Sequence, residues 1–276
     1  MGWRIMSVID QVFLSCKEER RAAFIPYLTG GDPDLATSGD LVAALVDGGA
    51  DIIEIGVPFS DPIADGPVNQ RAATRALESG TTLAGVLDLV ARHRARSAVP
   101  VVLFSYFNPF FVRGVEEFAA QAADSGVDGI LCVDLPPEEA ARDFAPALHR
   151  REIDTVFLLA PTSTTERIRQ VAETASGFVY YVSRTGVTGV QEDLAAELEK
   201  QVKRVRRRLE QPLAVGFGIS TPEQVDTVGM IADGVVVGSA LVRVVEEKRG
   251  ESDLATLVSA EARRLSAPLR NGRRRR

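Results

Sequence analysis

Glu54 is the residue whose type and position most strongly suggest chemistry. It stands in the run 51–56, DIIEIG, where almost every neighbour is apolar. Side chains alternate along a strand, so Ile52 and Glu54 share one face, Ile53 and Ile55 share the other, and the carboxyl has apolar surroundings on either face. Burial raises the pKa of a carboxyl toward the range useful for proton transfer. From spacing alone, a structural glutamate satisfied by hydrogen bonds is an equally good interpretation.

A second group of carboxylates follows in the loop 57–67, VPFSDPIADGP. This loop is dense in proline and glycine, and it is short enough to bring Asp65 back over the end of the strand that carries Glu54. Two carboxylates in different environments can divide acid and base roles. For Asp61 and Asp65 the alternative is a turn residue that bonds its own backbone.

Three glycine-rich turns follow the last predicted strands: SRTGVTG at 183–189, GFGIS at 216–220 and GSA at 238–240. Glycines allow backbone N–H groups to approach an anion, and a helix beginning at Gly238-Ser239 adds a favourable dipole. One such turn is ordinary, but three in these places indicate a phosphate site.

Aromatic residues lie in or just after the predicted strands, where they could line a flat apolar pocket: Phe24, Phe104, Tyr106, Tyr180 and Phe217. Taken singly, each of them has core packing as the default interpretation. His93 and His149 lie in helical patterns beside arginines, and we expect both at the surface. No metal site can be assembled from them.

The elements that must position these residues alternate between β-branched runs and helical patterns. Eight strands are predicted: Ala22–Leu28, Asp51–Ile55, Val99–Phe104, Gly129–Val133, Thr155–Leu159, Phe178–Val182, Leu213–Gly216 and Gly234–Val237. Helices are predicted between them, including Leu35–Val46, Leu83–His93, Val115–Ala123, Pro137–His149, Thr165–Thr174, Asp193–Leu209 and Pro222–Met230. Capping chemistry marks two helix starts, Asp32-Pro33 and Thr221-Pro222.

Eight βα units favour an α/β fold of the closed (βα)8 TIM-barrel type, with an open sheet as the alternative. Apolar residues at helical spacing before Lys17 predict an extra N-terminal helix that covers the barrel bottom. We expect one domain over 1–270 and a basic, disordered tail over 271–276, because the terminal arginines show no apolar periodicity.

Composition narrows the class of protein. The chain has 276 residues, 45% hydrophobic and 25% charged, and a net charge of -6, which argues against nucleic acid as the main partner. The basic stretch 203–208 reads as a solvated helix face. Only Cys16 and Cys132 occur, and no signal or membrane segment is recognisable, so we expect a cytoplasmic protein.

Four segments together resemble the tryptophan synthase alpha subunit family across nearly the whole chain. They are 25–33 (IPYLTGGDP), 53–67 (IEIGVPFSDPIADGP), 183–189 (SRTGVTG) and 216–220 (GFGIS). The second is long and highly specific. The resemblance implies a lyase of tryptophan biosynthesis that splits indole-3-glycerol phosphate into indole and D-glyceraldehyde 3-phosphate by a retro-aldol reaction.

The resemblance also assigns roles to residues. Glu54 would be the general acid and base, and Asp65 would stabilise positive charge at the indole nitrogen. The phosphate would be bound by Gly189, Gly218, Gly238 and Ser239. The indole pocket and its loop would comprise Phe24, Phe104, Tyr106, Tyr180, Thr188 and Phe217, with Asp134 supporting loop closure.

The family's alpha subunit works with a beta subunit that carries pyridoxal phosphate, in an alpha2beta2 heterotetramer through which indole is channelled. The alpha subunit itself would need no metal or cofactor. Pro58, Asp61 and Asn108 would lie at the partner contact. Phe104 and the bulky run 107–111 (FNPFF) depart from what the family leads us to expect.

Three alternatives remain at this point. The chain could be a stand-alone lyase that releases free indole, or an isomerase or synthase acting on a related sugar phosphate. It could also be a non-catalytic barrel that only activates a partner, although the presence of both Glu54 and Asp65 argues against that.

Overall fold

A computed structural model describes residues 6–183, 191–216 and 218–271. Eight parallel strands form a closed barrel in chain order, and the eighth pairs with the first. The closed (βα)8 barrel is therefore confirmed, and the open sheet is excluded. The strands are Ala23–Thr29 (β1), Ile53–Gly56 (β2), Val101–Ser105 (β3), Gly129–Cys132 (β4), Asp154–Leu159 (β5), Val179–Val182 (β6), Leu213–Gly216 (β7) and Gly234–Val237 (β8).

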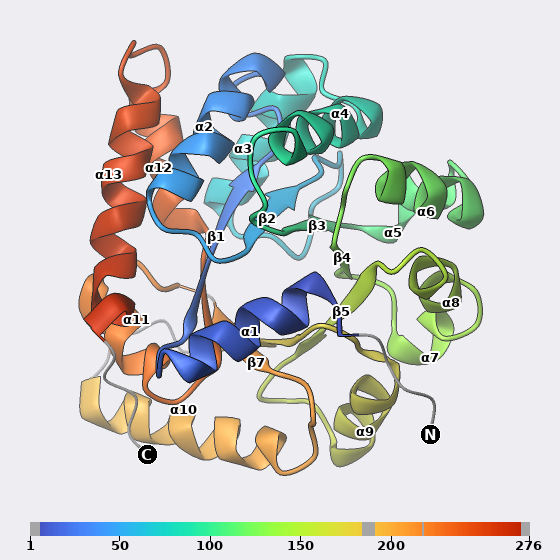
Figure 1. Cartoon of the computed structure of the whole chain (residues 1–276), viewed down its shortest axis with the longest axis vertical. Coiled ribbons are helices and arrows are strands. Elements are labelled where there is room, and N and C mark those ends of the chain that lie inside the picture. Colours follow the sequence, from blue (N-terminus) through green and yellow to red (C-terminus); the bar gives the residue numbers. More distant parts are fainter. Residues whose placement is uncertain (1–5, 184–190, 217, 272–276) are drawn as a thin grey trace.

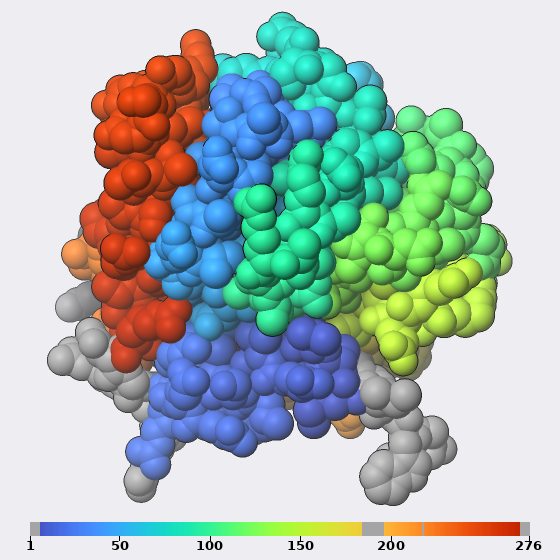
Figure 2. All heavy atoms as spheres, turned by 45° about the horizontal axis from the view of Figure 1, so that its top comes forward, coloured from blue at the N-terminus to red at the C-terminus, as the bar shows by residue number. Residues whose placement is uncertain are grey.

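Helices surround the strands on all sides (Figure 1). They are Val8–Glu18 (α1), Leu35–Asp47 (α2), Pro67–Glu78 (α3), Leu83–Arg94 (α4), Phe107–Phe111 (α5), Val115–Asp124 (α6), Pro137–Ala140 (α7), Phe144–His149 (α8), Thr165–Thr174 (α9), Gln191–Arg206 (α10), Pro222–Gly229 (α11), Ser239–Lys248 (α12) and Leu254–Ser266 (α13), followed by a 3-10 turn over Ala267–Asn271. Helix α13, near the C-terminal end of the chain, packs beside α2, which follows the first strand (Figure 2).

The N-terminal helix α1 covers one end of the barrel, as the sequence predicted. Its buried residues Ile9, Phe13 and Cys16 pack among the side chains that point into the barrel. The rings of Phe13 and Phe178 lie 5.6 Å apart, centroid to centroid. Figure 1 shows α1 crossing in front of the strands at this end. The amino-terminal end of the barrel is thereby filled, which leaves the carboxyl-terminal end for a site.

One predicted helix is wrong. The segment 137–149 forms two short helices, α7 and α8, with a turn at 141–143 between them. Pro146 has no N–H to donate, so it is tolerated in the first turn of a helix but not in the interior of a longer one. The chain therefore starts a new helix at Phe144, which places Pro146 in its first turn.

The helix starts confirm one predicted cap and correct the other. Thr221 caps α11 through a capping box with Gln224, and Pro222 follows in the first turn. At α2 the cap is Asp34, whose side chain accepts a hydrogen bond from the Thr37 N–H. Asp32, which we expected in this role, is buried and forms an ion pair with Arg75 at 2.7 Å instead.

Candidate active site

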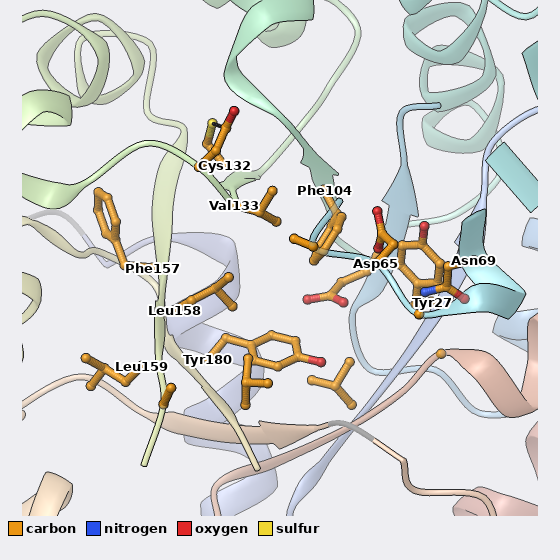
Figure 3. Close-up of a pocket in the computed structure, with 18 of the residues that line it drawn as sticks. Tyr27, Asp65, Asn69, Phe104, Cys132, Val133, Phe157, Leu158, Leu159 and Tyr180 are labelled. Carbon is orange, nitrogen blue, oxygen red and sulfur yellow. Dashed lines mark hydrogen bonds between the residues drawn. The ribbon is translucent and has the colours of Figure 1, made fainter. Parts of the chain in front are cut away.

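A cavity of about 850 Å³ opens at the carboxyl-terminal end of the barrel. This is the end at which barrel enzymes place their active sites, and the volume lies in the range of small-molecule pockets. Strands β1, β2, β3 and β6 contribute Tyr27, Glu54, Phe104 and Tyr180 to its wall. The loop after β2 adds Asp65, which Figure 3 shows beside Tyr27 and Phe104.

Glu54 lies at the base of this cavity with 1% of its surface exposed. Within residues 6–183, 191–216 and 218–271, its Oε1 atom has no hydrogen-bond partner. Burial raises the pKa of this carboxyl to about 8. Glu54 is therefore not a structural residue whose oxygens are all satisfied by hydrogen bonds. A buried carboxyl of this kind in a cleft is a candidate for a functional residue.

Asp65 reaches the same cavity in a different environment. Its Oδ2 accepts a hydrogen bond from the Tyr106 hydroxyl at 3.0 Å, and that hydroxyl accepts one from the Ala64 N–H at 2.8 Å. Burial is the largest influence on Asp65 and raises its pKa above the ordinary value, although hydrogen bonds with Tyr106 and Asn69 oppose that rise. The side-chain amide of Gln70 donates to the Asp65 carbonyl at 3.0 Å and so anchors the loop.

Aromatic rings form part of the wall of the cavity that holds both carboxyl groups. Tyr27 meets Phe104 edge to face, with ring centroids 5.5 Å apart and planes at 75°. Tyr27 also lies against Gly56, where an added Cβ would come within 2.2 Å of the tyrosine oxygen, and Tyr180 lies as close to Gly216, at 2.3 Å. These two glycines are the reason that two tyrosine rings fit inside the barrel.

The structure corrects the prediction for Phe24. Along β1, Ala23 and Ile25 belong to the barrel interior, and Tyr27 continues that face into the cavity. Phe24 points the other way and packs in the core between the barrel and its helices. It is not among the described residues that line the cavity. Alternation puts Phe24 and Tyr27 on opposite faces of β1, but only the closed barrel shows which face lines the cavity.

Other predicted pocket residues have varied outcomes. Phe104 and Tyr180 line the cavity. Tyr106 is buried beside it and acts on the cavity through its hydrogen bond to Asp65. Thr188 and Phe217 lie outside the described residues. Sequence reasoning also missed wall residues that carry no distinctive signal in the sequence. They come from α3, from the residue after β4 and from β5: Asn69, Val133, Phe157 and Leu158.

The predicted phosphate-binding residues lie together where the structure describes them. Gly218, Gly238 and Ser239 line one part of the cavity, whereas Gly189 falls outside the described residues. Gly218 has a φ of +73°, which favours glycine. Gly238 caps α12, and the first N–H groups of a helix have no partner within it, so they are free to bind an anion.

Comparisons with known proteins agree with this geometry. The family model described as tryptophan synthase alpha chain matches residues 13–268. The chain belongs to this family. The tryptophan synthase alpha chain of Geobacter sulfurreducens is 50% identical over 258 residues, which cover 92% of this chain and 97% of that protein.

Solved structures support the same family. The tryptophan synthase subunit alpha of Legionella pneumophila superposes with a TM-score of 0.89 at 36% identity, covering 97% of this chain and all of the other. An open form of tryptophan synthase from M. tuberculosis gives a TM-score of 0.86 at 36% identity, with 96% and 99% coverage. This alpha chain is thus a subunit of an enzyme of tryptophan synthesis.

The residues that family resemblance placed at a partner contact differ in exposure. Asp61 and Asn108 are exposed, but Pro58 is buried and is not presented at the surface of this alpha chain. Asp134 is exposed, and its carboxylate accepts a hydrogen bond from the Phe107 N–H at 2.7 Å, which holds the start of α5.

Two further expectations concern residues away from the site. His93 is buried, contrary to prediction, and its Nε2 lies 2.9 Å from the Val99 carbonyl oxygen, because the last turn of α4 folds back on the chain that enters β3. His149 is exposed as expected. In the described part of the chain, no helix is long and apolar enough to cross a membrane.

Proposed function

We propose that this alpha chain cleaves indole-3-glycerol phosphate into indole and D-glyceraldehyde 3-phosphate. The observation that carries the proposal is Glu54, which shares one cavity with Asp65. It is a buried carboxyl with a pKa raised to about 8, and its Oε1 has no hydrogen-bond partner in the part of the chain that the structure describes. A general acid with a pKa near the working pH transfers protons efficiently in both directions.

The raised pKa sets the order of proton transfers at Glu54. At neutral pH the carboxyl is mostly protonated, so it first donates its proton to C3 of the indole ring, and positive charge develops at the indole nitrogen. The resulting carboxylate then removes the proton from the C3′ hydroxyl. The C3–C3′ bond breaks as the C3′ oxygen forms a carbonyl, and the bond electrons return to the ring and neutralise the nitrogen. Glu54 ends protonated, ready for another turnover.

Asp65 supplies the negative charge that this sequence requires. Its hydrogen bonds with Tyr106 and Asn69 oppose the effect of burial and favour the ionised carboxylate, whereas the Oε1 of Glu54 has no hydrogen-bond partner among the described residues. An anion held in a partly buried site stabilises developing positive charge without first having to reorient. The two carboxyl groups are therefore assigned different roles by their environments.

The shape of the cavity suits the two ends of this substrate. Tyr27, Phe104 and Tyr180 offer ring faces and edges to an indole, while Gly218 and the start of α12 at Ser239 offer backbone N–H groups to a phosphate. A bound substrate would lie with its scissile bond between these ends. This arrangement favours indole-3-glycerol phosphate over a sugar phosphate that lacks an aromatic part.

We further propose that a pyridoxal-phosphate beta subunit binds over the loop after β2 and over α5, forming an alpha2beta2 assembly that receives the indole. Asp61 and Asn108 are exposed there. Three large apolar side chains are exposed on the same segments: Ile63 at 90%, Phe111 at 62% and Val112 at 76%. Exposed apolar side chains at a rim of polar residues are typical of a protein interface.

The test is indole release from indole-3-glycerol phosphate by the purified chain, with and without a tryptophan synthase beta subunit. We expect cleavage that rises strongly with the beta subunit. Cleavage that the beta subunit does not change would support a stand-alone lyase, and no cleavage in either condition would refute the proposed reaction.

Two variants locate the chemistry. Glu54→Gln keeps the size of the side chain but removes the proton carrier, so we expect indole release to fall nearly to zero while substrate still binds. Glu78→Gln makes the same chemical change at an exposed position at the end of α3 and should leave turnover unchanged. Normal turnover in Glu54→Gln would contradict the mechanism.

A further inference from the structure

We propose that Arg243 binds the phosphate group of the substrate and completes the phosphate site. This inference rests on the proposed function, because it concerns the same cavity. Arg243 lies on α12 and lines the cavity together with Gly218, Gly238 and Ser239. The sequence pattern that marked the glycine turns contains no cationic residue at this point, so the arginine was not predicted.

The helix geometry directs Arg243 toward the phosphate. Residues four apart lie on the same face of a helix, so Arg243 stands one turn beyond Ser239 on the side that faces the cavity. Side chains on a helix lean toward its N-terminus and cover the preceding turn. A side chain at Arg243 can therefore reach back toward the N–H groups at the start of α12.

Arg243 is also free to bind a ligand. It is exposed, and within the described ranges 6–183, 191–216 and 218–271 it forms no ion pair or side-chain hydrogen bond. The acidic residue three positions along, Glu246, is held by Arg71 at 2.6 Å and Arg75 at 2.9 Å. Those two arginines on α3 keep Glu246 from neutralising Arg243.

Among residues 6–183, 191–216 and 218–271, one other arginine lines the cavity, and it is differently placed. Arg167 on α9 forms an ion pair with Glu138 at 2.8 Å, and α9 follows β5 whereas α12 follows β8. Its charge is therefore already balanced within the protein. Of these two described cavity arginines, Arg243 is the one whose charge remains to be balanced by a ligand.

The charges involved make a cation useful here. A phosphate monoester carries a charge of about −1.5 to −2 at pH 7, whereas a helix N-terminus contributes only roughly half a positive charge. The cavity already contains the carboxylates of Asp65 and Asp134. A guanidinium matches phosphate oxygens with two parallel hydrogen bonds, which an ammonium does not.

The experiment compares Arg243→Gln and Arg243→Lys with Arg96→Gln. Arg96 is an exposed arginine after α4, at the opposite end of the barrel, and its replacement makes the same change in net charge. Two quantities are measured for each full-length variant: the Kd of glycerol 3-phosphate by calorimetry, and the KM and kcat of indole release.

We expect Arg243→Gln to raise both the Kd and the KM about tenfold, the factor that corresponds to about 1.4 kcal/mol of lost charge-assisted bonding. The kcat should change by less than about twofold, since the bond is made equally in ground and transition states. Arg243→Lys should recover part of the binding, and Arg96→Gln should match the parent chain.

An unchanged Kd and KM in Arg243→Gln would overturn the inference while leaving the proposed reaction intact. Equal weakening in Arg96→Gln would also overturn it, because the effect would then be a general one of net charge. If the parent chain binds glycerol 3-phosphate but releases no indole, the proposed function fails, and the comparison of Kd values still tests Arg243.

Discussion

Glu54 makes the stability of this protein depend on pH in a way that Glu54→Gln should remove. The pKa of this carboxyl is about 8 in the folded chain and has the ordinary value of 4.5 when the chain unfolds. Below pH 4.5 the carboxyl is protonated in both the folded and the unfolded chain, so its protonation does not change the free energy of unfolding. Between pH 4.5 and 8 the unfolded carboxyl is ionised while the folded one keeps its proton, so stability falls as pH rises.

The size of the effect follows from the two pKa values. At pH 7, keeping a proton on a carboxyl whose ordinary pKa is 4.5 costs roughly 3 kcal/mol, and above pH 8 the cost levels off at roughly 5 kcal/mol. Glutamine cannot ionise and has no such cost. The free energy of unfolding of Glu54→Gln, minus that of the parent chain, should therefore rise by about 1.4 kcal/mol per pH unit between these limits.

Urea unfolding of both proteins from pH 4 to pH 9 measures this difference. Taking the difference cancels the titration of all other groups, and any constant penalty for burying the amide shifts the curve without changing its slope. Glu78→Gln, at an exposed position, should give a flat difference. A flat difference for Glu54→Gln would refute the argument that burial holds the proton on this carboxyl.

Three further changes test the site. Tyr106→Phe removes the hydrogen bond that lowers the pKa of Asp65, so kcat should fall about tenfold and the acidic limb of the pH–rate profile should move to higher pH. Gly56→Ala would place a Cβ within 2.2 Å of the Tyr27 oxygen, and a thermal or urea melt should show a loss of about 1–3 kcal/mol from overpacking. Gly218→Val forces a branched side chain into a backbone with φ of +73°, so the KM for indole-3-glycerol phosphate should rise at least about tenfold. An unchanged KM would remove Gly218 from the phosphate site.

The sequence by itself determined the alternation of strands and helices and the position of Glu54 on a strand, and it favoured a closed barrel over an open sheet. These features depend on short stretches of sequence. Alternation within 51–56 places the Glu54 carboxyl among apolar side chains. Repeated βα units predict a parallel sheet covered by helices, and few folds provide that arrangement. Gly218 and Gly238 are likewise predictable from short stretches of sequence. Each stands in a turn directly after a strand, and such turns favour glycine in any barrel.

Tertiary structure decided which side chains meet. Closing the barrel fixes the direction of every strand residue, so Tyr27 faces the cavity and Phe24 packs behind it. The bond between Tyr106 and Asp65 joins residues from neighbouring loops, and no local pattern contains it. Arg243 acquires its place because α12 starts at the cavity, a fact that depends on where β8 lies in the closed barrel. Contacts between distant segments depend on the packing of the whole chain, and alternation or propensity within one segment cannot supply them.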